Sequence, residues 1–487
     1  MMHDDDSFYA AIASRDRRFE GRFVVAVRTT GVYCRPGCPA PLPKRKNTSF
    51  FACAAAAEQA GFRPCMRCRP ESSPGTPAWA GTSATVARAL RLIDEGALDG
   101  TDVDALAGRL GIGARHLRRL FIEHVGTSPI AIATTRRVHF ARKLIDETRL
   151  PMTEIAMSAG FASVRRFNDA IRHTFRKPPR ALRRDTAGPR DDDDALVLKL
   201  PFFPPYDWDA ALAFLAPRAI PGVERVFGGV YERTVDPACG LEVAHQEGAP
   251  CLRLTLRGSL PADLIGVVGR VSRLFDLGAD PARIAAHLGG DPRLAKLIAA
   301  HPGLRVPGAW DGFELVVRAV LGQQVSVKGA TTLAGRIVTA WGAPSKLARE
   351  GLTHLFPTPA VLASADLAKV GLPRARAETI RAVSIAMRDG ALTLGSSRSL
   401  EETVTHLTAL PGIGLWTANY VAMRACGEPD AFPSGDLGLR KAYGHGITAR
   451  ALEERAEAWR PWRAYAAMHL WMSLGQAPIK KKKGERT

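Results

Sequence analysis

The sequence contains two close pairs of cysteines near its start. Cys34 and Cys38 form a C-x3-C pair, and Cys65 and Cys68 form a C-x2-C pair about two dozen residues later. Two such pairs are the pattern of a tetrahedral zinc site with four thiolate ligands. A segment of about 75 residues has a small apolar core and gains stability from a metal cross-link. We therefore expect residues 1–78 to form a small α+β domain around one Zn²⁺ ion.

The other cysteines have no partner at metal-ligand spacing. They are Cys53, Cys239, Cys251 and Cys426, and we expect them to be small buried hydrophobic residues. The opening segment MMHDDDSFYA is acidic and has no apolar stretch of the kind that marks a secretory signal. No run approaches about 18 uninterrupted apolar residues, which excludes a transmembrane helix. These features favour metal ligands over a disulfide framework.

The length and charge of the chain indicate several domains and a nucleic-acid partner. At about 100–200 residues per domain, 487 residues correspond to three or four domains. The net charge is +19, of which residues 1–190 carry +14 and residues 191–487 carry +5. A basic front half is typical of binding to a polyanion such as DNA. A soluble protein from a generally basic proteome is the alternative interpretation of the charge alone.

Three breaks in composition divide the chain. Residues 70–83 are rich in Pro, Gly and Ser, and residues 183–194 are charged without apolar periodicity, so both are predicted linkers. A softer break lies at 301–312, and the tail at 480–487 is basic. The resulting predicted division is a zinc domain at 1–78, a helix-turn-helix domain at 83–184, a linker at 185–195, an α+β subdomain at 196–305, a helical domain at 306–478 and a tail at 479–487.

An internal repeat lies between the first two breaks. Residues 104–121 and 153–171 each consist of a short helix, a turn with glycine and a second amphipathic helix. Two helix-turn-helix units about 50 residues apart fit two successive major grooves, roughly 34 Å apart. A solvated helix face is the alternative reading of each single arginine. The candidate DNA contacts on the second helices are Arg115, Arg118, Arg119, Arg165 and Arg166.

The predicted zinc cluster is also expected to be chemically reactive and not only a structural cross-link. Four thiolates around Zn²⁺ leave a net charge of −2, so the sulfurs stay electron-rich and nucleophilic toward alkylating agents. The basic residues Arg45, Arg63 and Arg67 flank the cysteines and are candidates for holding a DNA phosphate beside them. An inert structural zinc site is the alternative.

Two stretches of the front half resemble known families. FVVAVRTTGVYCRPGCPAPLPKRKNTSFF and AGFRPCMRCRP resemble the N-terminal domain of Ada-type methyl-phosphotriester repair proteins, and IAMSAGFASVRRFNDAIRHTFRKPPRAL resembles the AraC family of DNA-binding domains. The resemblance implies that Cys34 takes a methyl group irreversibly from a phosphotriester. The net charge of the cluster then changes from −2 to −1, which weakens its repulsion of DNA and favours promoter binding. No Pro-Cys-His-Arg motif occurs, so we expect no direct repair of O6-methylguanine.

The back half combines strands, helices and a glycine hairpin. Alternating residues from 196 and at 253–257 predict a small α+β subdomain, and helical patterns follow Asp311. LPGIG at 410–414 precedes a helical run, so its glycines permit a tight turn and free helix amides can bind a phosphate. Asp436 follows AFPSG and precedes a helix, where Asp is commonly an N-cap.

These motifs resemble the helix-hairpin-helix glycosylases. PPYDWDAALAFLAPRA, GLRVPGAWDGFELVVRAVLGQQVSV, LPGIGLWTANYVAM and RPWRAYAAMHLW are similar to AlkA-type 3-methyladenine DNA glycosylases. The resemblance implies that Asp436 is the catalytic carboxylate, which stabilises positive charge on the sugar or orients water. It implies an aromatic base pocket of Trp416, Tyr420, Trp471 and Phe214, which would favour a flipped cationic base by cation–π contacts. Core packing is the alternative for each aromatic residue.

Two further positions refine the expected reaction. Bifunctional relatives have a Schiff-base lysine where this chain has Trp416, so a monofunctional, water-using glycosylase is expected. Gln324, in GQQVS, matches the residue that fills the gap left by a flipped base, and a glutamine there could also bond the orphaned partner base. Gly412 and Gly414 would bring the hairpin backbone close to a DNA phosphate.

Taken together, these features predict a mainly α, multidomain protein. It would combine a zinc methyl-phosphotriester sensor, a helix-turn-helix regulator and an alkylated-base glycosylase. The expected partners are double-stranded DNA, both alkylated and promoter, and RNA polymerase. We expect a monomer in the bacterial cytoplasm, associated with the nucleoid and with no membrane partner. Two alternatives remain: a front half that only delivers the enzyme to DNA, and a regulator whose glycosylase half is inactive.

Overall fold

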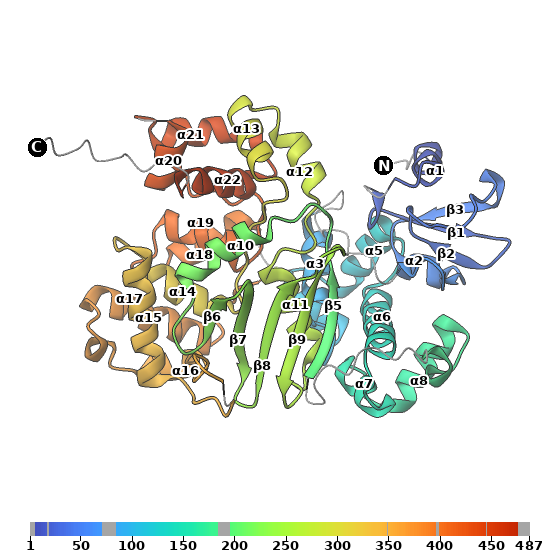
Figure 1. Cartoon of the computed structure of the whole chain (residues 1–487), viewed down its shortest axis with the longest axis horizontal. Helices are drawn as coiled ribbons and strands as arrows, with labels where there is room; N and C mark the ends of the chain where they lie inside the picture. Colours follow the sequence, from blue (N-terminus) through green and yellow to red (C-terminus); the bar gives the residue numbers. More distant parts are fainter. Residues whose placement is uncertain are drawn as a thin grey trace, which may run out of the picture.

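The computed structural model describes residues 5–16, 19–70, 84–183, 195–347, 349–395, 399–444 and 446–475. The fold is mainly helical with two small sheets, as the sequence predicts, and the N-terminal half packs beside the C-terminal half (Figure 1). The predicted linkers lie almost wholly outside the described residues, and the predicted tail lies outside them completely. No helix in the described ranges is long and apolar enough to cross a bilayer.

The first domain is a four-stranded sheet of order β3-β1-β2-β4 with two helices. A hairpin joins β1 to β2, and β2 then pairs in parallel with the short β4. The small core contains Phe8 and Phe23, whose rings stack with centroids 4.2 Å apart. The elements are α1 (Asp5–Ala13), β1 (Val24–Val27), β2 (Val32–Cys34), the 3-10 helix η2 (Arg45–Asn47), β3 (Thr48–Phe51), α2 (Ala54–Gln59) and β4 (Arg63–Pro64).

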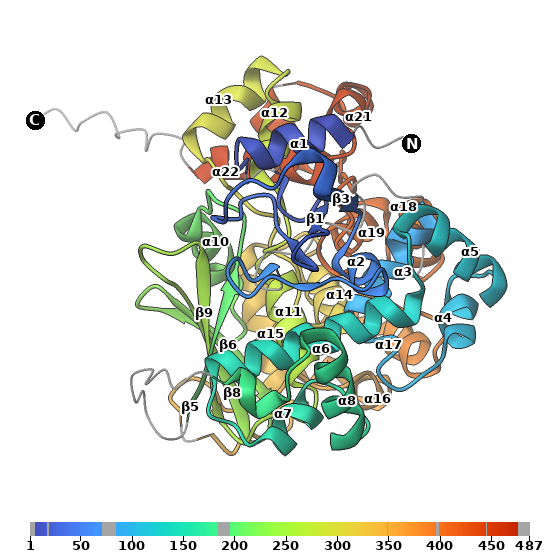
Figure 2. The same cartoon turned by 90° about the vertical axis from the view of Figure 1, so that its right-hand side faces the viewer.

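The second domain contains the predicted pair of helix-turn-helix units. Each turn has a glycine with positive φ, Gly111 at 71° and Gly160 at 77°, a conformation that glycine adopts without strain. The long helix α6 connects the two units (Figure 2). The elements are α3 (Ala84–Asp94), α4 (Val103–Arg109), α5 (Ala114–Val125), α6 (Pro129–Glu147), α7 (Met152–Ser158), α8 (Val164–Phe175) and α9 (Pro179–Leu182).

The third region is an antiparallel sheet of order β5-β9-β8-β7-β6 with flanking helices. The predicted strand at 253–257 lies within β9. Its elements are β5 (Ala195–Pro201), α10 (Trp208–Leu215), η4 (Ala216–Arg218), β6 (Glu224–Phe227), β7 (Val230–Asp236), β8 (Cys239–His245), β9 (Cys251–Gly258), α11 (Leu264–Leu274), α12 (Pro281–Leu288) and α13 (Pro292–Ala300).

The last region is helical, and its hairpin lies between α18 and α19. Buried residues of both helices, Leu407 and Ala418 among them, share one apolar core with α14, α15 and α17. The elements are α14 (Gly312–Leu321), α15 (Val327–Trp341), α16 (Pro359–Ser364), η5 (Leu367–Val370), α17 (Arg374–Arg388), α18 (Leu400–Thr408), α19 (Leu415–Arg424), α20 (Leu437–Tyr443), α21 (Ala449–Ala456), η6 (Glu457–Trp459) and α22 (Arg463–Gly475).

The final helices fold back onto the sheet subdomain. Helix α22 packs on α13, and the buried Trp459 donates a hydrogen bond to Asp291 at 3.2 Å. One hydrophobic core therefore runs through both regions. This return of the chain brings residues of α10, α19, α20 and α22 to the same place, where the candidate site of the back half lies.

Candidate functional sites

The four cysteines of the two predicted pairs converge at one end of the first sheet. Cys34 ends β2, and Cys65 directly follows β4. Because β2 and β4 are paired in parallel, the backbone amide of Cys65 donates a 2.9 Å hydrogen bond to the carbonyl of Tyr33. Cys38 and Cys68 lie in the turns that follow. The four Sγ atoms all lie within 4.8 Å of one another.

This arrangement fits a single zinc ion. Zn–S bonds of about 2.3 Å in a tetrahedron place the sulfurs about 3.8 Å apart, which is within the observed spacing. Cys34, Cys65 and Cys68 are buried, and Cys38 is half-buried. Hydrogen bonds among the four sulfurs lower the pKa of Cys38 and raise that of Cys34, so the thiols share their protons when no metal is bound.

The predicted basic residues around the cluster have different surroundings. Arg67 is exposed in the turn between Cys65 and Cys68. Arg63 is half-buried on β4. Arg45 forms ion pairs of 3.3 Å with Asp5 and Asp6 of α1, so a DNA phosphate would have to compete with these carboxylates.

The candidate DNA contacts of the repeat all face solvent. On α5 the apolar face, which includes Leu117 and Phe121, is buried, and α8 buries its own apolar face in the same way. The exposed faces carry Arg115, Arg118 and Arg119 on α5 and Arg165 and Arg166 on α8. Each unit therefore presents a basic helix surface of the kind that enters a major groove.

Asp436 is held by three N–H donors. Its Oδ1 accepts from the backbone amide of Leu439 at 2.8 Å, so Asp436 is the N-cap of α20. Trp471 on α22 donates to Oδ1 at 3.0 Å, and Trp416 on α19 donates to Oδ2 at 2.8 Å. Asp436 thus serves as a helix cap and also receives two indole donors from separate helices.

The predicted aromatic residues gather beside this carboxylate. The rings of Trp416 and Tyr420, four residues apart on α19, stack with centroids 5.3 Å apart and an angle of 7°. Trp471 meets Tyr420 edge-on at 6.3 Å. Phe214 of α10 is buried, and the guanidinium of Arg424 lies 4.9 Å from its ring and 5.5 Å from that of Tyr420.

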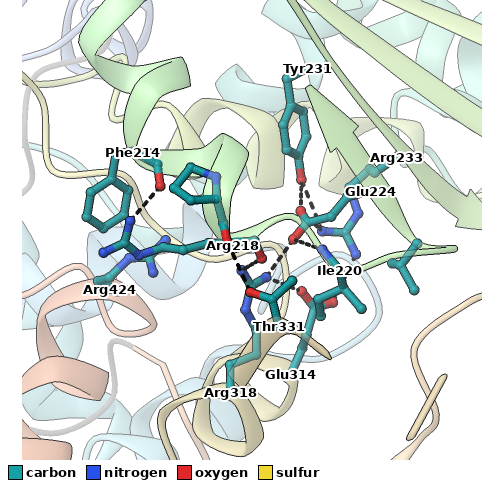
Figure 3. Close-up of polar contacts among 12 residues, drawn as sticks. Phe214, Arg218, Ile220, Glu224, Tyr231, Arg233, Glu314, Arg318, Thr331 and Arg424 are labelled. Atoms are coloured by element: carbon teal, nitrogen blue, oxygen red, sulfur yellow. Dashed lines mark hydrogen bonds and ion pairs between the residues drawn. The ribbon is translucent and has the colours of Figure 1, made fainter. Parts of the chain in front are cut away.

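Two arginines behind these rings change the chemistry of Tyr420. Arg424 donates a hydrogen bond to the Tyr420 hydroxyl at 2.7 Å. The guanidinium of Arg218 lies 3.9 Å from the centre of the Phe214 ring, and Figure 3 shows Arg218 and Arg424 beside this ring. Burial raises the pKa of Tyr420, but the charges of Arg424 and Arg218 outweigh it and lower the pKa to about 8. The two guanidinium groups therefore favour the phenolate form of Tyr420 over its usual balance.

Buried ion pairs fix this part of the sheet against the helical region. Arg233 of β7 pairs with Glu314 of α14 at 2.9 Å, and Arg318 pairs with Glu224 of β6 at 2.7 Å. Arg318 also donates to the carbonyl of Arg218, as Figure 3 shows. The group ties α14 to η4 and so sets the position of the adjacent Phe214.

The hairpin at 410–414 has one glycine that the geometry requires. Gly412 has φ of 80°, and a Cβ there would lie 2.0 Å from Thr379 Oγ1. Gly414 is the N-cap of α19 with φ of −91°, and a Cβ there would meet nothing within 4 Å. Its open surroundings leave the first amides of α19 accessible.

The GQQVS loop lies next to this hairpin. Gln323 donates to the carbonyl of Gly412 at 2.9 Å and to Thr417 Oγ1 at 3.1 Å. Gln324 is exposed and has φ of 56°, a left-handed conformation uncommon for a residue with a side chain. Gln323 thus anchors the loop that presents Gln324.

Sequence reasoning missed Arg218, Gln323 and Arg424. Arg424 lies four residues after Tyr420, and Arg218 lies four after Phe214, a spacing that places side chains on the same helix face. This periodicity was the available signal for both arginines. The contact of Gln323 with the hairpin joins residues 89 positions apart, and no local pattern reveals it.

Family models cover most of the chain. They match residues 7–71 to the metal binding domain of Ada, 106–185 to a helix-turn-helix domain, 197–311 to the AlkA N-terminal domain, and 317–463 to the HhH-GPD superfamily of base excision DNA repair proteins. The fold and sites therefore define a fusion of an Ada-type zinc and helix-turn-helix half with an AlkA-type glycosylase half. The metal specified by the matched domain and its four cysteines is zinc.

Whole-chain similarity agrees with this class. The chain is 44% identical to the probable bifunctional transcriptional activator/DNA repair enzyme AlkA of Mycobacterium tuberculosis, over 97% of both chains. It is 38% identical to DNA-3-methyladenine glycosylase 2 of Escherichia coli, over 56% of this chain and 96% of that one. It is 36% identical to the Escherichia coli Ada enzyme, over 32% of this chain and 43% of that one. The chain belongs to the family of the bifunctional transcriptional activator/DNA repair enzyme AlkA.

Proposed function

We propose that the C-terminal half excises alkylated bases of the 3-methyladenine class from double-stranded DNA by hydrolysis. The observation that carries this proposal is the position of Asp436. Two indole N–H groups and one backbone amide orient its carboxylate beside an aromatic cluster. Within the described ranges, Oδ2 accepts only the hydrogen bond from Trp416, so this oxygen has a lone pair left to face the sugar or a water molecule.

The reaction needs a negative charge next to the deoxyribose. As the bond between the base and C1′ lengthens, positive charge develops on the sugar, and a fixed carboxylate stabilises it electrostatically. The displaced electron pair stays on the base, which is already cationic and leaves without a general acid. Water adds to C1′ and loses a proton, which completes the hydrolysis. Trp416 has no amine to form a Schiff base, which supports a monofunctional enzyme.

The aromatic cluster supplies selectivity for a cationic base. Trp416 and Trp471 offer electron-rich faces, and each cation–π contact is worth roughly 0.5–2 kcal/mol. The ring of Tyr420, stacked on Trp416 and hydrogen-bonded by Arg424, forms a further aromatic side of this cluster. Gln324 on its exposed loop is proposed to fill the gap in the duplex, while the amides after Gly414 bind a backbone phosphate.

For the front half we propose irreversible methyl transfer to Cys34. The thiolate sulfur forms a bond to the methyl carbon of a phosphotriester, and the carbon–oxygen bond breaks to leave a phosphodiester anion. Cys34, Cys38, Cys65 and Cys68 would hold the zinc ion, which would keep their sulfurs in the electron-rich thiolate form. The negative charge of the site decreases by one unit, from −2 to −1, which lowers its repulsion of DNA. Arg67, with Arg45 and Arg63, is proposed to contact the phosphate.

The methylated front half is proposed to act as a transcriptional activator. The exposed arginines of α5 and α8 would contact promoter DNA in two successive major grooves. RNA polymerase is the proposed protein partner of the activated state. We further propose that the protein works as a monomer in the bacterial cytoplasm at the nucleoid, with the domain division given by the sequence.

Excision of methylated bases tests the catalytic assignment. Purified protein should release 3-methyladenine from methylated DNA, and Asp436→Asn should lower the single-turnover rate by at least about 100-fold. Cys34→Ser is the matched control, since it removes the methyl acceptor and should leave base release unchanged. Unchanged release by Asp436→Asn would refute the role of Asp436.

Promoter binding separates regulation from simple delivery to DNA. Labelled methyl groups from phosphotriester DNA should appear on Cys34, and protein methylated in this way should protect a specific promoter at lower concentration than unmethylated protein. Label on a different cysteine would refute the acceptor assignment. Equal promoter affinities of the two forms would favour a front half that only delivers the glycosylase.

A further inference from the structure

A buried polar network joins the methyl-acceptor strand to the helix-turn-helix domain. Tyr33, the residue before Cys34 on β2, is fully buried, and its hydroxyl donates to Glu58 Oε1 of α2 at 2.8 Å. His139 Nε2 of α6 lies 3.0 Å from the same oxygen and 3.2 Å from the Tyr33 hydroxyl. Thr135, one helical turn before His139, donates to Glu58 Oε2 at 2.7 Å.

The network sits on a longer contact between the two domains. Thr127, near the start of α6, is fully buried and donates to the side chain of Gln59 at 2.5 Å. Near the other end of α6, Asp146 pairs at 2.9 Å with Arg69, the residue after Cys68. Helix α6 is therefore bound beside both halves of the cysteine cluster, next to Cys34 and next to Cys68.

Because Glu58 is buried, its contact with α6 requires one geometry. Burial raises the pKa of Glu58, but its bonds to His139, Thr135 and Tyr33 lower the pKa below the usual value, so the group is a carboxylate. A buried carboxylate is costly unless donors satisfy it. Thr135 and His139 can both reach Glu58 only when α6 lies in one register against α2, because the two residues are fixed one helical turn apart.

We propose that Tyr33, Glu58, Thr135 and His139 are positioning residues that lock the Cys34 strand onto α6. Helix α6 also connects the two helix-turn-helix units, so the zinc cluster and both recognition helices would meet one duplex in a fixed spatial relation. Linked binding modules gain affinity and orientation when their geometry matches the target. The proposal rests on the proposed methyl transfer to Cys34 and goes beyond it, because it assigns a function to four residues outside the zinc site.

Two methyl donors distinguish positioning from reactivity. Methyl iodide reaches Cys34 by diffusion and depends on the cluster alone, whereas a phosphotriester in DNA must be presented by the bound duplex. In the full-length zinc-loaded protein, Tyr33→Phe and Glu58→Gln should slow methylation from DNA by about tenfold. Methylation by methyl iodide should proceed at the wild-type rate, with one zinc ion retained per chain.

A matched variant controls for loss of a tyrosine hydroxyl in the same domain. Tyr9→Phe removes the bond from Tyr9 to the carbonyl of Pro43, which lies within the first domain. Tyr9→Phe should be methylated at the wild-type rate both by methyl iodide and by phosphotriester DNA. Wild-type rates from DNA in Tyr33→Phe and Glu58→Gln would overturn the proposal. An equal fall in the methylation rate with methyl iodide and with phosphotriester DNA would also overturn the proposal, because the network would then act on the reactivity of the cysteine cluster itself.

The salt dependence of promoter binding provides a second readout. Each phosphate contact adds about one unit to the slope of log affinity against log salt concentration. Methylated wild-type protein should have a steeper slope than methylated Tyr33→Phe, whose zinc domain no longer binds in register with α5 and α8. An identical slope would contradict the inference.

If the wild-type protein transfers no methyl group from DNA, the proposed function fails instead, and methyl iodide labelling still reports the state of Cys34.

Discussion

The indole nitrogen of Trp416 donates a 2.8 Å hydrogen bond to Oδ2 of Asp436, although the two residues are 20 positions apart. The same ring stacks on Tyr420, so one side chain both orients the carboxylate and forms a face of the aromatic cluster. Trp471 donates to the other carboxylate oxygen at 3.0 Å. The carboxylate is therefore oriented by the aromatic residues proposed to bind the base.

This relationship predicts the effect of removing either indole N–H group. A hydrogen bond to a charged group is worth about 1.5–3 kcal/mol, so Trp416→Phe and Trp471→Phe should each lower the base-release rate roughly 10- to 100-fold. Trp341→Phe, at the end of α15, is the control and should have wild-type activity. Single-turnover release from methylated DNA measures the effect, and wild-type rates in both site variants would contradict it.

The lowered pKa of Tyr420 predicts a pH effect on stability. The folded-state pKa of about 8 lies below the usual value of 10, so the folded chain holds fewer protons than the unfolded chain between these pH values. This contribution is complete above about pH 10 and is lost as pH falls through 8. The unfolding free energy of wild type minus that of Tyr420→Phe should rise by about 2–3 kcal/mol from pH 7 to 10. A difference that is constant with pH would refute the shift.

The two hairpin glycines should respond differently to alanine. Gly412→Ala places a Cβ against Thr379 at a positive φ and should cost about 1–3 kcal/mol of stability. Gly414→Ala has open space and a negative φ, so its melting temperature should stay close to wild type. Thermal unfolding of the two variants provides the comparison, and equal losses would contradict the assigned hairpin geometry.

A partly buried ion pair predicts coupling between the two halves of the chain. Arg91 of α3 lies 3.0 Å from Glu428, which follows α19, and both side chains are at most 15% exposed. Arg91→Glu should lower stability by about 1–3 kcal/mol through like-charge contact, and the swap Arg91→Glu with Glu428→Arg should recover most of it. A double-mutant cycle on unfolding free energies measures this coupling. Additive losses would show that the halves are not coupled here.

Removal of zinc should abolish methyl transfer to Cys34 and leave base release unchanged. The first domain has a small core, so a strong chelator should unfold residues 5–70, make the four thiols reactive and abolish methylation of Cys34. Base release should be retained, because Asp436 and its partners lie in the other half of the chain. Loss of base release on zinc removal would instead indicate that the glycosylase half depends on the zinc domain.

Local patterns were sufficient to predict much of the architecture. Cysteine spacing predicts a four-sulfur metal site, glycine turns predict the helix-turn-helix repeat, and alternation predicts the strand at 253–257. Each of these signals depends on neighbours within a few residues, where backbone geometry fixes the relation between side chains. The roles of Cys34 and Asp436 came from resemblance to known families, and they remain predictions.

The sequence by itself determined the metal site and the helix-turn-helix repeat, and its resemblance to glycosylases named the aromatic and acidic residues of the candidate site. Only the tertiary structure decided that Trp416 and Trp471 converge on Asp436, that two arginines lower the pKa of Tyr420, and that Tyr33 reaches His139 through Glu58. Except for Arg424 and Tyr420, which share α19, these contacts join residues of separate elements, such as Tyr33 and His139, which are 106 positions apart. Their distances depend on how helices and sheets pack, and packing is set by the burial of whole faces, which no local pattern encodes.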